Sequence, residues 1–205
     1  MGYYEDLKDR VWMYNWRRVL VPQGMLAPDT GDVDLRYFGK RQIWISAKDM
    51  TPRTTAGAQA TTREINGITV PVLAFDQTSD EGANFTVFFP KRWNAGTVTY
   101  QPVWTCTGGG AAETVQFELR GGCFANDAAI NTTGFGTAVA VDDTWIADDD
   151  LHLASQSAVI TLSNAADDKP VIFEIIRDVS DDTLTADAEL LGIKLSYTES
   201  AGHDE

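Results

Sequence analysis

Residues 142–152, DDTWIADDDLH, form the densest group of side chains that could do chemistry, with five aspartates and one of the two histidines of the chain. Hard cations such as Ca²⁺ take oxygen ligands from loops, so Asp148 and Asp150 are candidate calcium ligands. The segment lacks the glycine and the ligand order of an EF-hand, and aspartates also cap backbone donors in solvated turns. We therefore predict a turn between strands, with Trp145 and Ile146 facing inward and calcium as the alternative.

Nucleophilic catalysis would have to rest on His152, because His203 lies in the polar tail and no serine has a Gly-x-Ser-x-Gly context. His152 alternates with Leu151 and Leu153, which predicts a strand in which the imidazole faces solvent. A glycosidase would need one carboxyl in an apolar pocket, whereas most acids here stand in runs typical of turns. We expect no catalytic residue, no enzyme activity and no cofactor.

Two further features carry alternatives. Gly108, Gly109 and Gly110 lack the lysine and the following helix of a phosphate-binding loop, so they predict a hairpin tip. Trp93, in KRWNAG (91–96), and Trp145 both lie in turn-like segments. Either ring could stack on a sugar, or could fold back and plug an open end of the fold.

The elements that must position these residues are strands, because from residue 41 onward apolar residues alternate with a period of two. Eight or nine strands are expected, separated by Gly, Asp, Asn or Pro clusters, and no helical pattern interrupts them. The runs after Ile43 and Ile45 are 68–75, 85–89, 97–104, 114–119, 137–141, 151–162, 171–176 and 190–197. We predict an all-β, antiparallel two-sheet sandwich of jelly-roll or Greek-key type, with Pro71 and Pro102 on edge strands.

The first 42 residues differ from the sandwich domain predicted for 43–200 and from a polar tail at 201–205. Helical spacing at 3–19 predicts a short amphipathic helix, which Pro22 and Gly24 end before an extended arm. Aromatic side chains are enriched at the centres of interfaces, so the segment is expected to dock on the sandwich or on a neighbouring subunit. The candidate anchor residues are Tyr3, Tyr4, Leu7, Val11, Trp12, Trp16, Tyr37 and Phe38.

Charge and cysteine content exclude several classes. Residues 1–63 hold ten Lys/Arg and seven Asp/Glu, a net of +3, whereas residues 64–205 hold six and twenty-three, a net of −17. Such an acidic domain repels nucleic acid. No apolar run is long enough for a membrane span, and the first residues do not resemble a signal peptide, so we expect a cytoplasmic origin. Cys106 and Cys123 are predicted to be too far apart for a disulfide.

Six segments carry a resemblance to a known family. They are WISAKDMTPRTT (44–55), LAFD (73–76), FPKRWNAGTV (89–98), WIADDDL (145–151), FEIIRDVSDDTL (173–184) and LLGIKLSY (190–197). In this order they resemble a family of bacteriophage and prophage virion proteins. The resemblance implies a β-sandwich module of a fibre, a spike or the capsid decoration, commonly trimeric, with no catalytic residues.

Together these features predict a non-enzymatic virion protein, assembled in the bacterial cytoplasm and attached through its N-terminal arm with the sandwich facing outward. Its partners would be further copies of itself, as a homotrimer, and other virion proteins. Charge and hydropathy exclude nucleic acid and membranes as partners. The alternative is a carbohydrate-binding or host-recognition module that uses Trp93 or Trp145 as its platform.

Overall fold

The computed structural model describes residues 25–26, 36–37, 39–131 and 134–199. The predicted helix, the polar tail and all anchor residues except Tyr37 lie outside this part of the chain. Tyr37 belongs to β2 (Arg36–Tyr37), whose backbone pairs antiparallel with β1 (Met25–Leu26). The described residues hold no helix of the length and apolarity that a membrane crossing requires.

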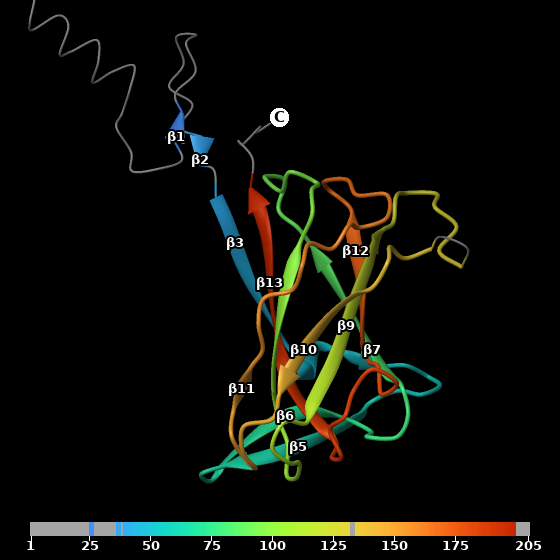
Figure 1. Ribbon diagram of the computed structural model, residues 1–205. Helices are drawn as coiled ribbons and strands as arrows, with labels where there is room; N and C mark the ends of the chain where they lie inside the picture. The colour runs from blue at the N-terminus through green and yellow to red at the C-terminus, as the bar shows by residue number, and fades with distance from the viewer. Residues whose placement is uncertain (1–24, 27–35, 38, 132–133, 200–205) are drawn as a thin grey trace, which may run out of the picture.

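Two antiparallel sheets face each other and form a β-sandwich (Figure 1). The five-stranded sheet runs β10 (Val139–Thr144), β9 (Thr114–Cys123), β12 (Pro170–Arg177), β7 (Glu81–Phe88) and β4 (Thr51–Pro52). The six-stranded sheet runs β11 (His152–Leu153), β8 (Thr99–Thr105), β13 (Ala188–Glu199), β6 (Ile68–Phe75) and β5 (Gln59–Ile65), with β3 (Gly39–Ser46) also on β13. The 3₁₀ turn η1 (Ala47–Asp49) follows β3. The predicted fold class is confirmed, although its first strand begins at Gly39 rather than at residue 43.

The core lies between the sheets and is built by the alternation of each strand. Phe85 of β7 and Phe173 of β12 stack with ring centroids 5.1 Å apart, and Phe75 meets Phe117 edge to face at 5.6 Å. Burying aromatic side chains removes a large apolar area from water, and their offset and edge contacts add to that gain. The sandwich is therefore held chiefly by rings from strands that are distant in sequence.

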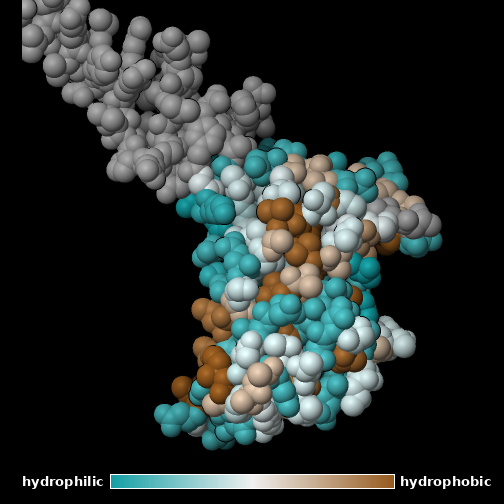
Figure 2. All heavy atoms as spheres, in the orientation of Figure 1, coloured by the Kyte–Doolittle hydropathy of each residue, from teal (hydrophilic) through white to brown (hydrophobic). Residues whose placement is uncertain are grey.

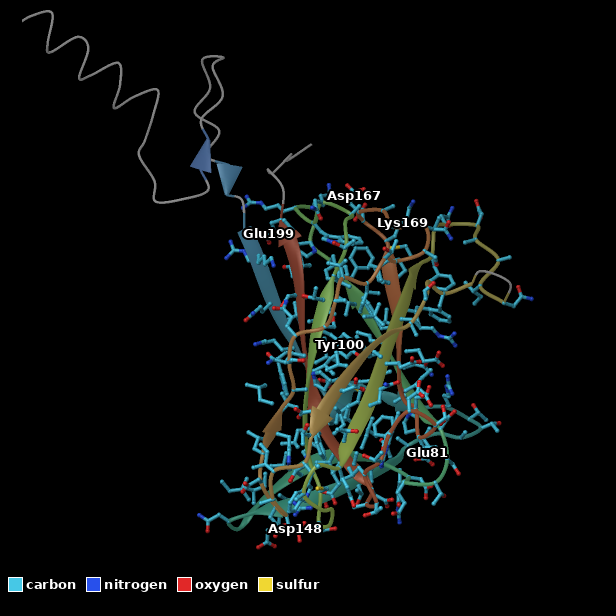
Figure 3. All side chains as sticks on the ribbon, viewed as in Figure 1. Glu81, Tyr100, Asp148, Asp167, Lys169 and Glu199 are labelled. Atoms are coloured by element: carbon cyan, nitrogen blue, oxygen red, sulfur yellow. The ribbon has the colours of Figure 1, made fainter. Side chains whose placement is uncertain are left out.

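Two polar side chains tie the sheets together inside this core. The Tyr100 hydroxyl on β8, at the centre of Figure 3, donates to the carbonyl oxygens of Phe117 at 2.6 Å and Val139 at 2.9 Å. The Trp104 indole N–H donates to Asp143 Oδ2 at 2.8 Å. Burial raises the pKa of Tyr100, so its hydroxyl remains a donor, and buried polar groups of this kind fix the register of the two layers.

The glycine run does not form the predicted hairpin tip. Strands β8 and β9, on either side of Gly108–Gly110, belong to different sheets, so this connection crosses the end of the sandwich. The other expectation from this region is confirmed, because Cys106 and Cys123 are both buried free thiols.

The prediction that both prolines mark edge strands is wrong for Pro102. Its strand β8 lies inside the sheet, with Ile193 opposite Pro102 on β13 and the Ala154 N–H donating to the Pro102 carbonyl at 3.1 Å on the other side. Proline offers no N–H in return, and the Gln101 side chain instead donates to the Ala154 carbonyl at 2.6 Å. Pro71 fits the prediction better, since it pairs with Thr62 at a point where β6 has no partner on β13.

The described chain enters and leaves the sandwich at one end. Gly39 at the start of β3 lies opposite Glu199 at the end of β13, whereas the β5–β6 hairpin lies at the far end (Figure 1). Figure 3 places Glu199 and Asp148 at these opposite ends.

Candidate functional site

The loop 142–152 is held by His152, which is buried and not exposed as predicted. The imidazole stacks on Trp104 with ring centroids 4.0 Å apart. Its Nε2 accepts the Ile146 N–H at 2.9 Å, so Nδ1 carries the proton and donates to the Asp150 carbonyl at 3.0 Å. With both ring nitrogens used by the backbone, His152 fastens the loop and has no nitrogen left for chemistry.

Four of the five aspartates of this loop are exposed, and the fifth, Asp143, is half-buried. Ile146 is also exposed (62%), contrary to the inward orientation predicted for it. The Asp150 carbonyl accepts the Thr105 hydroxyl at 2.8 Å. Nowhere in the described residues do three or more His, Cys, Asp or Glu side chains gather so as to hold a metal ion. Calcium at Asp148 and Asp150 therefore gains no support from the structure.

Neither tryptophan proposed as a sugar platform presents an open ring. Trp93 is 3% exposed and stacks on Phe89 at 4.5 Å, so it plugs the end of the core. Trp145 is half-buried and packs on Gly109, where an added Cβ would lie 2.6 Å from the indole Nε1. The platform interpretation is wrong for Trp93, and the inward orientation predicted for Trp145 is confirmed.

A pocket of about 500 Å³ lies beside the β5–β6 hairpin and brings together Asp149 and Glu189. Arg63 occupies the space between these carboxylates, bonding to Glu189 at 2.6 Å and also to Asp149. A glycosidase needs two carboxyl groups that are open to the sugar, whereas both carboxylates of this pocket are already bound to Arg63.

Glu174 is a buried carboxylate on the outer face of the five-stranded sheet. Its two oxygens accept from Arg53 Nε and Arg120 Nε, each at 2.6 Å. Burial alone would raise the pKa of Glu174, but the hydrogen bonds and charges of the two arginines outweigh burial and lower it. Glu174 is therefore an ionised structural group and is unsuited to act as a general acid.

Arg177 makes the most deeply buried ion pair in the described residues. Its Nε and Nη2 donate to Asp182 Oδ2 and Oδ1 at 2.7 and 3.1 Å. Its remaining N–H groups donate to the carbonyl oxygens of Phe75, Ala186 and Leu184 at 2.8 to 3.0 Å. All five guanidinium donors are satisfied, so this pair fastens the 178–187 connection to the core.

One open aromatic ring lies on the outer face of the six-stranded sheet. Ile43 and Ile45 of β3 pack against the core, which turns Trp44 outward with 51% of its surface exposed. Its indole reaches over β13, where an added Cβ at Gly192 would lie 2.6 Å from Cζ2 and 2.9 Å from Cη2 of Trp44. The absence of a side chain at Gly192 thus makes room for the ring, which the sheet supports from below.

The strands beside Trp44 extend this surface. Lys194 lies directly opposite Trp44 on β13, and Val103 on β8 lies opposite Gly192. Val103 is itself buried, whereas Leu153 on β11, opposite Val103, is exposed. Figure 2 shows hydrophobic atoms gathered along the side of the molecule where β11 and the β5–β6 hairpin lie. We call the outward-facing positions of β3, β8 and the second half of β13 the Trp44 face.

Sequence reasoning missed Trp44 although the signal was present. The alternation of Ile43 and Ile45 with Trp44 already predicts that the ring points away from the core. What the sequence does not show is the glycine on a strand 148 positions later that lets the ring lie across the sheet (192 − 44).

Comparisons with known proteins identify no family, since no family model and no curated protein matches the chain. Among solved structures, similarity was found to the CBM36-1 domain of a multidomain xylanase from the hindgut metagenome of Trinervitermes trinervoides (TM-score 0.40, 12% identity, 76% of this chain and 96% of that chain). A carbohydrate-binding module specific for non-crystalline cellulose, CBM28, gives a TM-score of 0.42 at 9% identity over 76% of this chain and 89% of that chain.

A third similar structure holds the CBM22-1 and GH10 modules of a Clostridium thermocellum xylanase (TM-score 0.45, 13% identity, 78% of this chain and 27% of that chain). Similarity this low says nothing about what the present chain binds. The resemblance to phage virion proteins stays a prediction, and function has to be argued from the chain's own surface.

Proposed function

We propose that this protein is a non-catalytic module that binds carbohydrate through the Trp44 face. The observation that carries the proposal is the indole of Trp44, held over Gly192 and half-exposed on a rigid sheet. A flat aromatic ring that the sheet holds in one orientation can stack on the apolar face of a ligand without a large loss of conformational freedom. The platform is therefore Trp44 and not Trp93 or Trp145.

The chemistry of the Trp44 face fits a sugar. The face of an aromatic ring carries partial negative charge, which attracts the C–H groups on the apolar face of a pyranose. Around the ring, Gln42 on β3 and the Gln101 amide oxygen on β8 are polar groups at outward positions that can contact sugar hydroxyls. A few polar groups around an apolar contact are what fixes a ligand's orientation.

The test compares Trp44→Ala with the wild-type chain on a glycan array, followed by titration against the glycans that bind. Loss of a stacked ring should weaken binding about tenfold or more. Phe88→Ala is the matched control, because Phe88 is 61% exposed on the outer face of the other sheet. The proposal fails if the wild-type chain binds no glycan, or if Trp44→Ala and Phe88→Ala bind as the wild type does.

A second proposal, compatible with the first, is that the module is a component of a phage virion, attached at one end. It is supported by the pairing of Gly39 with Glu199, which brings the described chain into and out of the sandwich at the same end. Attachment at that end would leave the outer face of the six-stranded sheet, with the Trp44 face, open to a ligand. Homotrimers and contacts with other virion proteins belong to this proposal.

The virion proposal can be tested by removing residues 1–38, which leaves β3 intact. The truncated chain should fold, measured by circular dichroism, but should not enter particles. Normal copy number of the truncated chain in purified virions would refute attachment through this segment. Light scattering of the full chain would show whether it forms trimers.

A further inference from the structure

The Trp44 face differs in charge from the chain as a whole. The chain has 30 Asp and Glu against 16 Lys and Arg, a net charge of −14. None of the outward strand positions around Trp44 is acidic, and two of them are lysines. These positions are Lys40, Gln42, Trp44, Thr99, Gln101, Val103, Gly192, Lys194, Ser196 and Thr198.

The carboxylates nearest to this surface along β13 are turned away from it or already bound. Glu199 is buried on the core side and accepts from Arg41 at 2.9 Å. Glu189 is separated from Lys194 by the irregularity between Leu190 and Gly192, and Arg63 donates to it at 2.6 Å. The described strand positions around Trp44 thus carry a net positive charge, on a chain whose net charge is −14.

The two lysines are placed to act together with the ring. Lys194 is the direct cross-strand neighbour of Trp44, so their Cβ atoms are about 5 Å apart. Lys40 lies four residues before Trp44 on β3, which is about 13 Å along an extended strand. Neither lysine makes an ion pair with any residue that the structure describes.

We propose that the ligand of the Trp44 face is an acidic polysaccharide whose sugar rings carry carboxylates, as uronic acids do. This inference rests on the proposed function. One ring stacks on Trp44 while a carboxylate on it or on its neighbour pairs with Lys194, and a longer chain reaches Lys40. A neutral glycan would leave both ammonium groups unused, and the net charge of −14 on the chain disfavours an acidic glycan away from such lysines.

The experiment uses the full chain and a panel of polygalacturonate, alginate and hyaluronate, each paired with its carboxyl-reduced neutral form. Affinity is measured by titration at low and high salt. The acidic form should bind more tightly than its neutral counterpart, and salt should weaken only the acidic form, because exposed ion pairs are screened. Lys194→Gln should weaken binding of the acidic form about two- to fivefold, as for an exposed ion pair, and leave the neutral form unchanged.

Lys169→Gln is the matched control, because Lys169 directly precedes β12 of the other sheet. Figure 3 shows it at the same end of the sandwich as Glu199. Equal affinity for acidic and neutral forms, lost on Trp44→Ala, would overturn the acidic ligand and leave carbohydrate binding standing. Equal weakening by Lys169→Gln and Lys194→Gln would also overturn the assignment to this face. Failure of every glycan on the panel and on the array to bind would overturn both proposals.

Discussion

Replacing Asp182 by asparagine should destabilise the sandwich by about 3 to 5 kcal/mol, the cost of removing one partner of a buried ion pair. The Asp182 side chain is 2% exposed and that of Arg177 is fully buried. Two charge-assisted hydrogen bonds are at stake, each contributing about 1.5 to 3 kcal/mol. The asparagine amide would also place N–H groups against other donors, because both carboxylate oxygens of Asp182 accept from Arg177 and from backbone N–H groups.

Urea unfolding followed by tryptophan fluorescence measures this effect. The midpoint should fall by at least about 1 M with little change in slope. Asp181→Asn is the matched control. Asp181 is the exposed neighbour of Asp182, so its replacement should change the free energy of unfolding by less than about 0.5 kcal/mol. If Asp182→Asn costs under about 1 kcal/mol, or no more than Asp181→Asn, the buried pair does not fasten the 178–187 connection as argued.

Three further predictions follow from the described contacts. Glu174→Gln should lower stability at neutral pH and flatten its acid dependence. The folded pKa of Glu174 lies below the ordinary value of 4.5. The wild type therefore keeps the stability contributed by ionised Glu174 above pH 4.5 and loses it as the pH falls through the folded pKa. If urea unfolding shows the same difference in stability between the two proteins at every pH down to about pH 3, the prediction is contradicted. Tyr100→Phe should cost about 1 to 3 kcal/mol, because two buried carbonyl oxygens lose their donor, and a thermal midpoint equal to that of the wild type would refute it. Gly109→Ala should displace the Trp145 ring and change its fluorescence, because Gly109 has φ +145° and the ring in its way; Gly134→Ala, where an added Cβ meets nothing within 4 Å, should leave the spectrum unchanged.

The strands that alternate against a core could be predicted from the sequence because alternation reports burial directly. The predicted run 68–75 coincides with β6, and the runs in β12 and β13 fall within one or two residues of the observed bounds. By contrast β5 was missed, because most of its side chains are exposed and show no alternation. The turn Asn66-Gly67 that follows it, with φ of +49° and +81°, is a strong hairpin signal and would have revealed it.

The side chains that bond to the backbone could not be predicted, because their partners are remote or irregular. Alternation with two leucines predicts an outward His152, but the loop folds back so that the ring stacks under it and bonds to Ile146 and Asp150. Likewise the order of strands, which separates β8 from β9, depends on pairings distant in sequence. Local patterns fix which face of a strand is apolar and say little about what covers the other face.

That limit explains why the sequence points to turns for a sugar platform, whereas the platform we propose lies on a strand. A ring that binds ligand must stay exposed in one orientation, whereas the two rings in turns are held by contacts that bury them, Trp93 against Phe89 and Trp145 over Gly109. A sheet separates the two demands, because Ile43 and Ile45 anchor β3 in the core while the residue between them faces solvent. The glycine on β13 then sets where the ring lies. Among the tryptophans that the structure describes, Trp44 alone has both properties, and this is the physical reason for assigning the binding surface to it.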